Sequence, residues 1–370
     1  MNELRPKWDA LGVPVMIALV SGLLTLGLGF ASLITVENYF PVTFGEIWNR
    51  WDTLHYLDMV RHGYSQDAEW EHLTVFFPLY PTLIYLGTFV FPDATISALV
   101  VSNAAFAVAL VFLSRLAALD FSPQCVELAV VFSAFFPTAY FFHLGYTESL
   151  YFALSIASFY MARKGNWVAA GILGFFVATT RLPGLALAVA LAVEYLHQKR
   201  FRFREVRWDC LWTQLPFTGF GVYLLINQIV FGSPFMFLEV QKQIYARELG
   251  SPLTGLINDW EGLFTGSPAT RFLMSGSDIV AFVFTLVVLV WSAVKLRPSY
   301  TVYAVLLWLL TFCYGFWMSV PRLILVIFPM YFFLACLTEK RPALRYSLFF
   351  ACLFPYVLGT LQFARGWWAH

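Results

Sequence analysis

The sequence predicts an all-α polytopic membrane protein, and three observations support this fold class. First, 60% of the 370 residues are hydrophobic and 12% are charged, whereas soluble domains carry about 25% charged residues. Second, aromatic residues make up 19% of the chain, and tryptophan and tyrosine are enriched where membrane proteins meet lipid headgroups. Third, long apolar stretches recur along the whole chain, and its mean hydropathy is +0.71.

The apolar stretches divide the chain into eleven predicted spans, since a membrane-spanning helix needs about 20 apolar residues. The first stretch is too long for the apolar region of a cleavable signal peptide, so we interpret it as a retained span. No soluble domain, low-complexity tract or internal repeat is recognisable, which predicts a single transmembrane domain over residues 1–370. The predicted spans are 12–36, 95–115, 124–143, 147–163, 167–183, 184–197, 211–231, 279–295, 301–318, 323–337 and 346–363.

The segment 74–92 decides the orientation of everything that follows it. It is apolar enough to cross a membrane, but Pro78 and Pro81 stand near its start. Basic residues near span ends favour the cytoplasm, and most of them fall on that side only if 74–92 lies along the outer surface or dips into the bilayer. This threading places the amino terminus in the cytoplasm and the carboxyl terminus outside. It creates two long outer loops, at 37–94 and 232–278.

Several function classes are excluded by what the sequence lacks. A net charge of +1 without a long basic run gives no sign of nucleic-acid binding. No Walker-type glycine loop, GxGxxG or GxSxG pattern is present, which removes nucleotide-driven pumps and serine hydrolases. The five cysteines lie within apolar segments or at their edges, so structural disulfides are not expected.

The first outer loop contains a predicted amphipathic helix over residues 46–62. Neither glycine nor proline interrupts this stretch, and Ile47, Trp51 and Leu54 recur at a spacing of three to four residues, which is typical of a helix face. We expect this helix to lie in the membrane interface with Trp48 and Trp51 toward lipid.

Asp52, His55 and Tyr56 share one face of this predicted helix, at positions i, i+3 and i+4. A carboxylate beside an imidazole can act as the general base that takes a proton from an attacking hydroxyl. An ordinary solvated acidic face and a metal site are the alternatives. No HExxH or other tight ligand spacing appears, so the sequence predicts no metal. The ligands of such a site would be His55, Asp58, His62 and His72.

Three further charged residues fall at the outer ends of predicted spans. They are Glu148 in GYTES, Arg181 in ATTRLPG and Arg322 in SVPRL. A charge near the hydrocarbon is costly unless it is paired or reaches the headgroups, so such residues are functional candidates. Two arginines can bind and neutralise a lipid-linked phosphate, while Asp52 or Glu148 deprotonates an acceptor hydroxyl. The plainer alternative is a structural pair such as Glu148 with Arg181.

The second outer loop mixes short amphipathic pieces with Ser-Pro and Gly-Ser breaks. This pattern predicts one or two surface helices rather than a folded domain. Such helices are placed to cover a lipid substrate or to admit an acceptor.

Four motifs together resemble the PIG-V-like mannosyltransferases, which are class C (GT-C) integral membrane glycosyltransferases. The motifs are RWDTLHYLDMVRHGY with FFPLYP, FFPTAYFFHLGYTESLYF, an arginine ending the next span, and a late VPR. The resemblance is dense from about Ile47 to Gly184 and follows the span pattern afterwards. It implies a GT-C-like fold of about eleven transmembrane helices.

The resemblance also implies the chemistry. It implies a polyprenyl- or dolichyl-phosphate mannose donor, inversion at the anomeric carbon, and catalysis on the outer face without a cofactor. Trp51 and Asp52 match the first-loop acidic motif, and Glu148 matches the second acidic position. Arg181 matches an arginine that usually begins an R-S-N-G string, which reads R-L-P-G here. The eukaryotic member acts in GPI-anchor assembly, but the acceptor does not follow from the likeness.

The combined hypothesis is an inverting transferase that moves mannose or a related hexose from a polyprenyl-phosphate carrier to a hydroxyl of a lipid, glycan or protein acceptor. We expect a multi-pass protein of a bacterial inner membrane with its site on the periplasmic face. A transporter or lipid flippase, and a noncatalytic subunit of a glycosylation complex, are the alternatives. The predicted roles are catalysis for Asp52 and Glu148, phosphate binding for Arg181 and Arg322, and substrate contact for Trp51, His55, Tyr56 and Tyr146.

Overall fold

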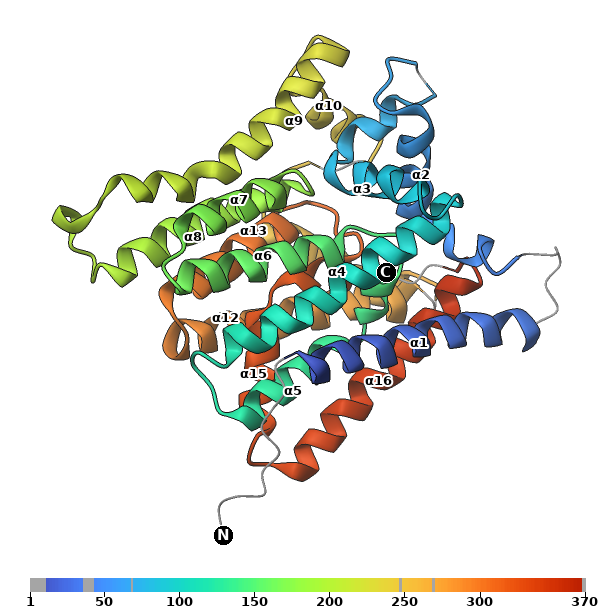
Figure 1. Ribbon diagram of the computed structural model, residues 1–370. Coiled ribbons are helices and arrows are strands. Elements are labelled where there is room, and N and C mark those ends of the chain that lie inside the picture. Colours follow the sequence, from blue (N-terminus) through green and yellow to red (C-terminus); the bar gives the residue numbers. More distant parts are fainter. Residues whose placement is uncertain (1–10, 36–42, 68, 246–247, 268–269, 368–370) are drawn as a thin grey trace.

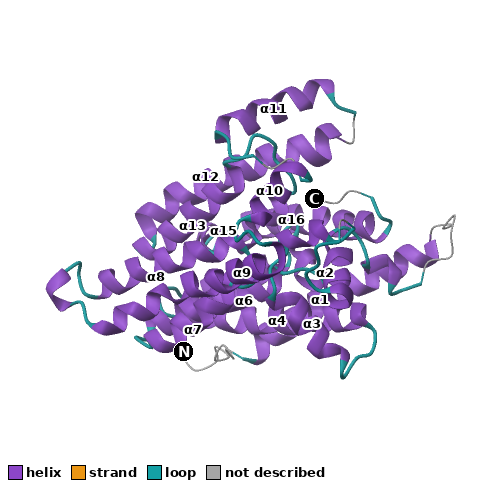
Figure 2. Ribbon diagram, turned by 90° about the horizontal axis from the view of Figure 1, so that it is seen from above, coloured by secondary structure: helices purple, strands orange, loops and turns teal. Residues whose placement is uncertain are grey.

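The computed structural model describes residues 11–35, 43–67, 69–245, 248–267 and 270–367. The chain is helical throughout these ranges, and Figures 1 and 2 show its helices gathered into one bundle. The α-helices are α1 (Gly12–Thr35), α2 (Asp52–His62), α3 (Leu79–Thr88), α4 (Ala94–Ala117), α5 (Pro123–Ala134), α6 (Glu148–Arg163), α7 (Trp167–Ala178), α8 (Leu185–Gln198), α9 (Leu215–Phe231), α10 (Met236–Gln243), α11 (Pro252–Thr265), α12 (Ser277–Lys295), α13 (Pro298–Phe312), α14 (Val320–Leu323), α15 (Pro329–Thr338) and α16 (Pro342–Ala364).

The all-helical membrane fold is confirmed, but the count of eleven spans is not. Each predicted span contains a helix, yet only five described helices are long and apolar enough to cross a membrane, or six if one bent pair counts as a span. Four further apolar helices are shorter, at 10 to 17 residues. The five long helices run over Gly12–Ile34, Ala94–Ala117, Trp208–Phe231, Met274–Lys295 and Pro342–Ala364.

Prolines explain why two predicted spans are not single helices. In 124–143 the helix α5 stops at Ala134, because Pro137 follows, and the chain continues through a short 3-10 turn, Ala139–His143. In 323–337 the segment Val320–Val326 meets α15 at an angle of 86°. The break falls at Pro329, because the backbone nitrogen of proline carries no hydrogen and cannot donate a helical hydrogen bond.

The helix expected over 46–62 begins only at Asp52. A 3-10 turn covers Glu46–Trp48, and Trp51 then adopts φ 52° and ψ −125°, a conformation rarely used by residues with a side chain. The expectation that Trp48 faces lipid is wrong, because Trp48 is fully buried. Its ring packs on α1 at Gly29, where a methyl group would lie 2.3 Å from the ring. Trp51 is 42% exposed.

The segment 74–92 forms α3, a helix of ten residues. At about 1.5 Å per residue such a helix covers roughly half of a bilayer core. It packs on α4, where the Ser97 hydroxyl donates to the Ile84 carbonyl at 2.7 Å. The segment therefore does not cross the membrane as one helix, as the positive-charge argument requires.

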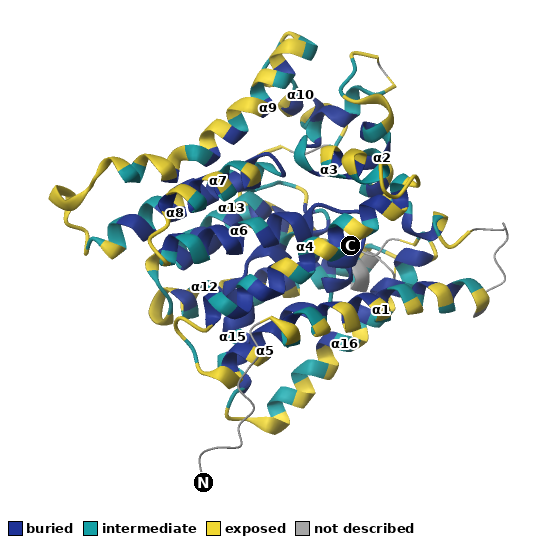
Figure 3. Cartoon of the chain, viewed as in Figure 1, coloured by how far each residue is buried: buried dark blue, intermediate teal, exposed yellow. Residues whose placement is uncertain are grey.

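Burial follows the position of each helix in the bundle. Figure 3 shows the centre of the molecule buried, with α4 and α6 running through it. The peripheral helices α1, α9 and α16 expose leucine, isoleucine and phenylalanine along their outer faces. An apolar outer surface around a buried bundle is the pattern that lipid contact requires. All five cysteines are free.

A buried ionic cluster joins α6, α8 and the start of α13. Glu194 of α8 is completely buried. It accepts hydrogen bonds from Arg297 at 2.8 Å, Ser299 at 2.6 Å and Gln198 at 2.9 Å. Arg163 of α6 lies 3.8 Å away. Glu194 compensates the charge of Arg297, whereas Arg163 also pairs with Asp120 at 2.5 Å. Together these contacts hold the ends of the three helices.

Replacing Glu194 by alanine is expected to destabilise the protein by about 3 to 5 kcal/mol, because it leaves buried arginine charge without its partner. Thermal unfolding of the purified protein in detergent measures this effect. Glu205→Ala is the matched control, because Glu205 forms only an exposed pair with Arg202 at 3.2 Å, and it should leave the melting temperature nearly unchanged. Equal melting temperatures for the two variants would contradict the structural role of the cluster.

Candidate functional site

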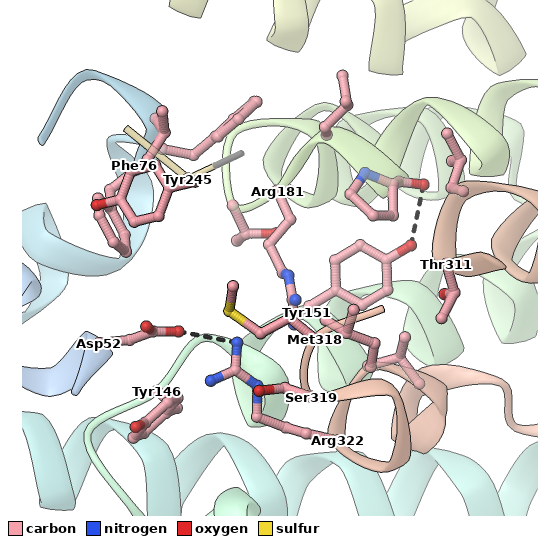
Figure 4. A pocket seen from close by; sticks show the side chains of 18 of the residues that line it. Asp52, Phe76, Tyr146, Tyr151, Arg181, Tyr245, Thr311, Met318, Ser319 and Arg322 are labelled. Atoms are coloured by element: carbon pink, nitrogen blue, oxygen red, sulfur yellow. Dashed lines mark hydrogen bonds and ion pairs between the residues drawn. The ribbon is translucent and has the colours of Figure 1, made fainter. Parts of the chain in front are cut away.

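A cavity of about 330 Å³ lies where residues of the two long loops meet the segment between α7 and α8, the end of α13 and α14. Figure 4 shows Asp52, Arg181 and Arg322 in this cavity, with aromatic side chains around them. The cavity also has apolar lining residues, which include Leu182, Pro183, Leu307, Leu310, Leu323 and Val326.

The two acids and two arginines singled out from the sequence form one cluster. Arg322 pairs with Asp52, Nη2 to Oδ2, at 2.8 Å (Figure 4). Arg181 pairs with Glu148, Nη1 to Oε1, at 2.9 Å. The Nε of Arg322 lies 3.2 Å from the same Glu148 oxygen. Two positive and two negative charges thus meet with no net charge among them.

The two carboxylates occupy different places in this cluster. Glu148 starts α6, its side chain is 1% exposed, and it does not line the cavity. Asp52 starts α2, its side chain is 30% exposed, and it lines the cavity. A substrate in the cavity would therefore contact Asp52, while Glu148 lies behind the arginines as their counter-charge. One oxygen of Glu148, Oε2, has no hydrogen-bond partner.

Local backbone structure brings the arginines to the cavity. Arg181 lies after α7 in an extended conformation, directly before the 3-10 turn Leu182–Gly184 that leads into α8. Arg322 lies in α14, directly after Pro321. This helix begins after Ser319, whose backbone is in a left-handed conformation (φ 58°). Its guanidinium lies 5.0 Å from the ring centre of Tyr146. The aromatic face attracts the cation and limits the positions that the guanidinium can take.

The charges around Asp52 keep it ionised. Burial raises the pKa of Asp52, but the charges of Arg322, His55 and Arg181 lower it by more, so it lies below the ordinary value of 3.8. Because folding lowers the pKa of Asp52, the ion pair stabilises the folded protein at pH values above the ordinary pKa of 3.8. This stabilisation is lost as the pH falls through the pKa of the folded state. The pKa of His55 is lowered, chiefly by burial.

The four predicted substrate-contact residues all line the cavity, but they present different groups to it. The hydroxyl of Tyr56 lies 3.5 Å from Thr147, and that of Tyr146 donates to the Arg50 carbonyl at 3.3 Å. These two rings therefore form walls. Trp51 and His55 are more accessible, and the strained backbone of Trp51 turns the chain into α2 beside the cavity.

The second outer loop contributes residues that sequence reasoning missed. Gln241 of α10 and Tyr245 just after it line the cavity together with Ser319 and Thr180. From the sequence this loop is expected to form surface helices, with Lys242, Arg247 and Arg271 as possible phosphate contacts or as part of a solvated face. Lys242 and Arg271 do not line the cavity, and Arg247 lies outside the described residues. The short amphipathic stretch FLEVQKQIY was the available signal, but nothing in it shows which side chain points inward.

A metal site is the remaining alternative for the first-loop histidines. Within the described ranges no three His, Cys, Asp or Glu side chains lie close enough to hold a metal ion together. His55 and His72 do meet, at 3.1 Å, whereas His62 stacks on Trp70. The structure therefore brings two of the four residues, His55 and His72, into contact, while the ring of His62 packs elsewhere.

The arrangement of helices is that of the GT-C membrane glycosyltransferases, as the sequence predicted. ArnT from Cupriavidus metallidurans, in a crystal structure with undecaprenyl phosphate, is similar over 90% of this chain and 62% of its own, with a TM-score of 0.52 and 12% identity. The oligosaccharyltransferase of Archaeoglobus fulgidus is similar over 95% of this chain and 53% of its own, with a TM-score of 0.54 and 14% identity.

A sequence match supports the narrower likeness. GPI mannosyltransferase 2 of Schizosaccharomyces pombe is 29% identical over 158 residues, which are 42% of this chain and 33% of that protein. The resemblance to PIG-V-like enzymes within the GT-C class is thereby confirmed. The chain spans about a third of that relative's length. No protein-family model matches the sequence.

Proposed function

We propose that this protein is an inverting glycosyltransferase that moves mannose from a polyprenyl-phosphate carrier to a hydroxyl group of an acceptor. The observation that carries the proposal is the cavity itself. Two arginines and one accessible carboxylate line it together with a set of apolar side chains. A lipid-linked sugar phosphate has matching parts, an anionic group between a sugar and an isoprenoid chain.

The reaction breaks one bond and forms one bond. The acceptor oxygen attacks the anomeric carbon, and the bond from that carbon to the phosphate oxygen breaks with its electron pair on the phosphate. Arg181 and Arg322 neutralise the charge that develops there. The proton of the acceptor hydroxyl passes to Asp52. Because the arginines supply the compensating charge, the proposed reaction needs no metal or other cofactor.

Donor binding also prepares the base. In the structure the carboxylate of Asp52 is paired with Arg322 at 2.8 Å. An arriving phosphate competes for the same guanidinium, which weakens the pair and makes Asp52 a better proton acceptor. Glu148 keeps both arginines in place from behind. The reactive carboxylate is thus stronger as a base when the donor is present.

The membrane side and the acceptor belong to this proposal as well. The Glu194 cluster lies where the chain carries its basic connections, which favours the cytoplasm for that end and the non-cytoplasmic face for the cavity. A bacterial inner membrane with a periplasmic site fits this orientation. The acceptor is a lipid, a glycan or a protein, and the chain needs no nucleic acid.

The test supplies polyprenyl-phosphate mannose to the purified protein and follows the release of polyprenyl phosphate, with membrane extract as the source of acceptor. The natural sequence should release polyprenyl phosphate from the donor. Arg181→Ala should lower this rate about a hundredfold or more, because it removes one of the two positive charges that stabilise the departing phosphate. Arg202→Ala is the control, because Arg202 is exposed and pairs only with Glu205. If the natural sequence releases no polyprenyl phosphate, the mannose donor is wrong, and other lipid-linked sugars are the next substrates to offer.

A further inference from the structure

Two histidines next to the cavity form a contact that the proposed reaction does not use. His55 of α2 lines the cavity, and its Nδ1 lies 3.1 Å from Nε2 of His72. The other nitrogen of His72, Nδ1, lies 3.0 Å from the backbone carbonyl of Glu69. The ring of His55 also packs on Phe76, with ring centres 5.0 Å apart.

These contacts determine which nitrogens carry hydrogen. A carbonyl oxygen only accepts hydrogen bonds, so Nδ1 of His72 must carry a hydrogen to bond to Glu69. A neutral His72 then has its lone pair on Nε2, and His55 must donate to it from Nδ1. The remaining nitrogen of His55, Nε2, is left with a lone pair.

We propose that His72 fixes the tautomer of His55 so that Nε2 of His55 enters the cavity as a hydrogen-bond acceptor for a second hydroxyl of the acceptor substrate, beside the hydroxyl that Asp52 deprotonates. His72 is a positioning residue in this proposal, and His55 is a specificity-determining one. The substrate class that fits is a polyol such as a sugar or inositol headgroup, because it offers two neighbouring hydroxyl donors. This assignment of the acceptor rests on the proposed function, whereas the tautomer does not.

Geometry and charge favour this role. Asp52 and His55 are one helical turn apart on α2 and both line the cavity, so two acceptors face the same space with no donor between them on that helix face. The charged groups that act on His55 are Asp52 and Asp58 from α2 and His72 from the 3-10 turn Glu71–Val75. Without His72 an imidazole favours hydrogen on Nε2, which would turn a donor toward the substrate.

The first test reads the tautomer directly. Nitrogen chemical shifts of the full-length protein with labelled histidine in detergent distinguish the two tautomers, and six histidines are present. We expect hydrogen on Nδ1 of His55 in the natural sequence and in His72→Gln, whose amide oxygen takes the place of Nε2. We expect hydrogen on Nε2 in His72→Phe, which keeps a ring but has no acceptor. Hydrogen on Nδ1 in His72→Phe would overturn the proposal.

The second test measures transfer from polyprenyl-phosphate mannose to octyl mannoside as the probe hydroxyl compound. His72→Phe should raise the KM for octyl mannoside about tenfold, the worth of one hydrogen bond, with little change in kcat. His72→Gln should restore the KM to that of the natural sequence. His62→Gln is the control, since His62 is exposed on the same helix and stacks only on Trp70. An unchanged KM in His72→Phe would overturn the proposal.

The two tests separate this inference from the proposed function. If no variant and not even the natural sequence transfers mannose, the proposed function fails, and the nitrogen shifts alone decide whether His72 sets the tautomer. If transfer proceeds while the shifts show hydrogen on Nε2 of His55 in the natural sequence, the proposed function stands and the histidine assignment fails.

Discussion

Replacing Arg322 by alanine is expected to lower donor turnover about a hundred- to a thousandfold, the usual effect of removing a charge that stabilises a transition state. Arg322 is the residue that contacts both carboxylates of the site, at 2.8 Å from Asp52 and 3.2 Å from Glu148. Its loss removes a phosphate contact and leaves Glu148 with Arg181 alone. Release of polyprenyl phosphate measures the effect on turnover.

The same change should destabilise the fold by about 3 kcal/mol, the lower end for breaking a buried pair, because Asp52 keeps some contact with water. Thermal unfolding therefore has to be recorded beside turnover, at a temperature where the variant remains folded. Arg61→Ala is the matched control, since Arg61 is exposed and pairs with Asp58 at 3.4 Å on the same loop. The turnover and stability of Arg322→Lys should lie between those of the natural sequence and of Arg322→Ala, because a single ammonium group cannot contact both carboxylates. Full activity in Arg322→Ala would rule out the phosphate role.

Changing Asp52 to asparagine is expected to reduce transfer about a hundred- to ten-thousandfold, the range for loss of a general base. The amide has the shape of the carboxylate but cannot take the proton of the acceptor hydroxyl. Stability should change little by comparison with Arg322→Ala, because Arg322 retains Glu148 as a partner. Transfer to acceptors in membrane extract is the measurement, with donor binding recorded separately.

Asp58→Asn is the control for this change. Asp58 lies on the same helix, and its carboxylate pairs with Arg61 rather than with a residue of the cavity. The outcome also decides between classes of function. Undiminished transfer in Asp52→Asn would rule out Asp52 as the base. A noncatalytic subunit or a transporter would instead show no transfer even with the natural sequence.

Much of the site could be predicted because charge near a membrane is rare and therefore informative. Arg181 and Arg322 are candidates on that ground, and Asp52 is one because it shares a helix face with His55. The structure brings all three to one cavity. The structural pair of Glu148 with Arg181, weighed as the plainer alternative, is also present. The structural pair and the proposed phosphate site are compatible, because a carboxylate that holds Arg181 in place also positions this arginine for a phosphate.

The sequence by itself determined that the chain is an all-helical membrane protein, that 74–92 does not cross as one helix, and which charged residues deserve a role. These conclusions depend on composition, which indicates contact with lipid, and on the local spacing of apolar residues, which indicates helices. The tertiary structure decided that Trp48 packs on Gly29, that Glu148 contacts the arginines without lining the cavity, and that Tyr245 lines the cavity. Such facts depend on contacts between segments far apart in the chain, and helical periodicity shows which face is apolar but not which neighbour will cover it.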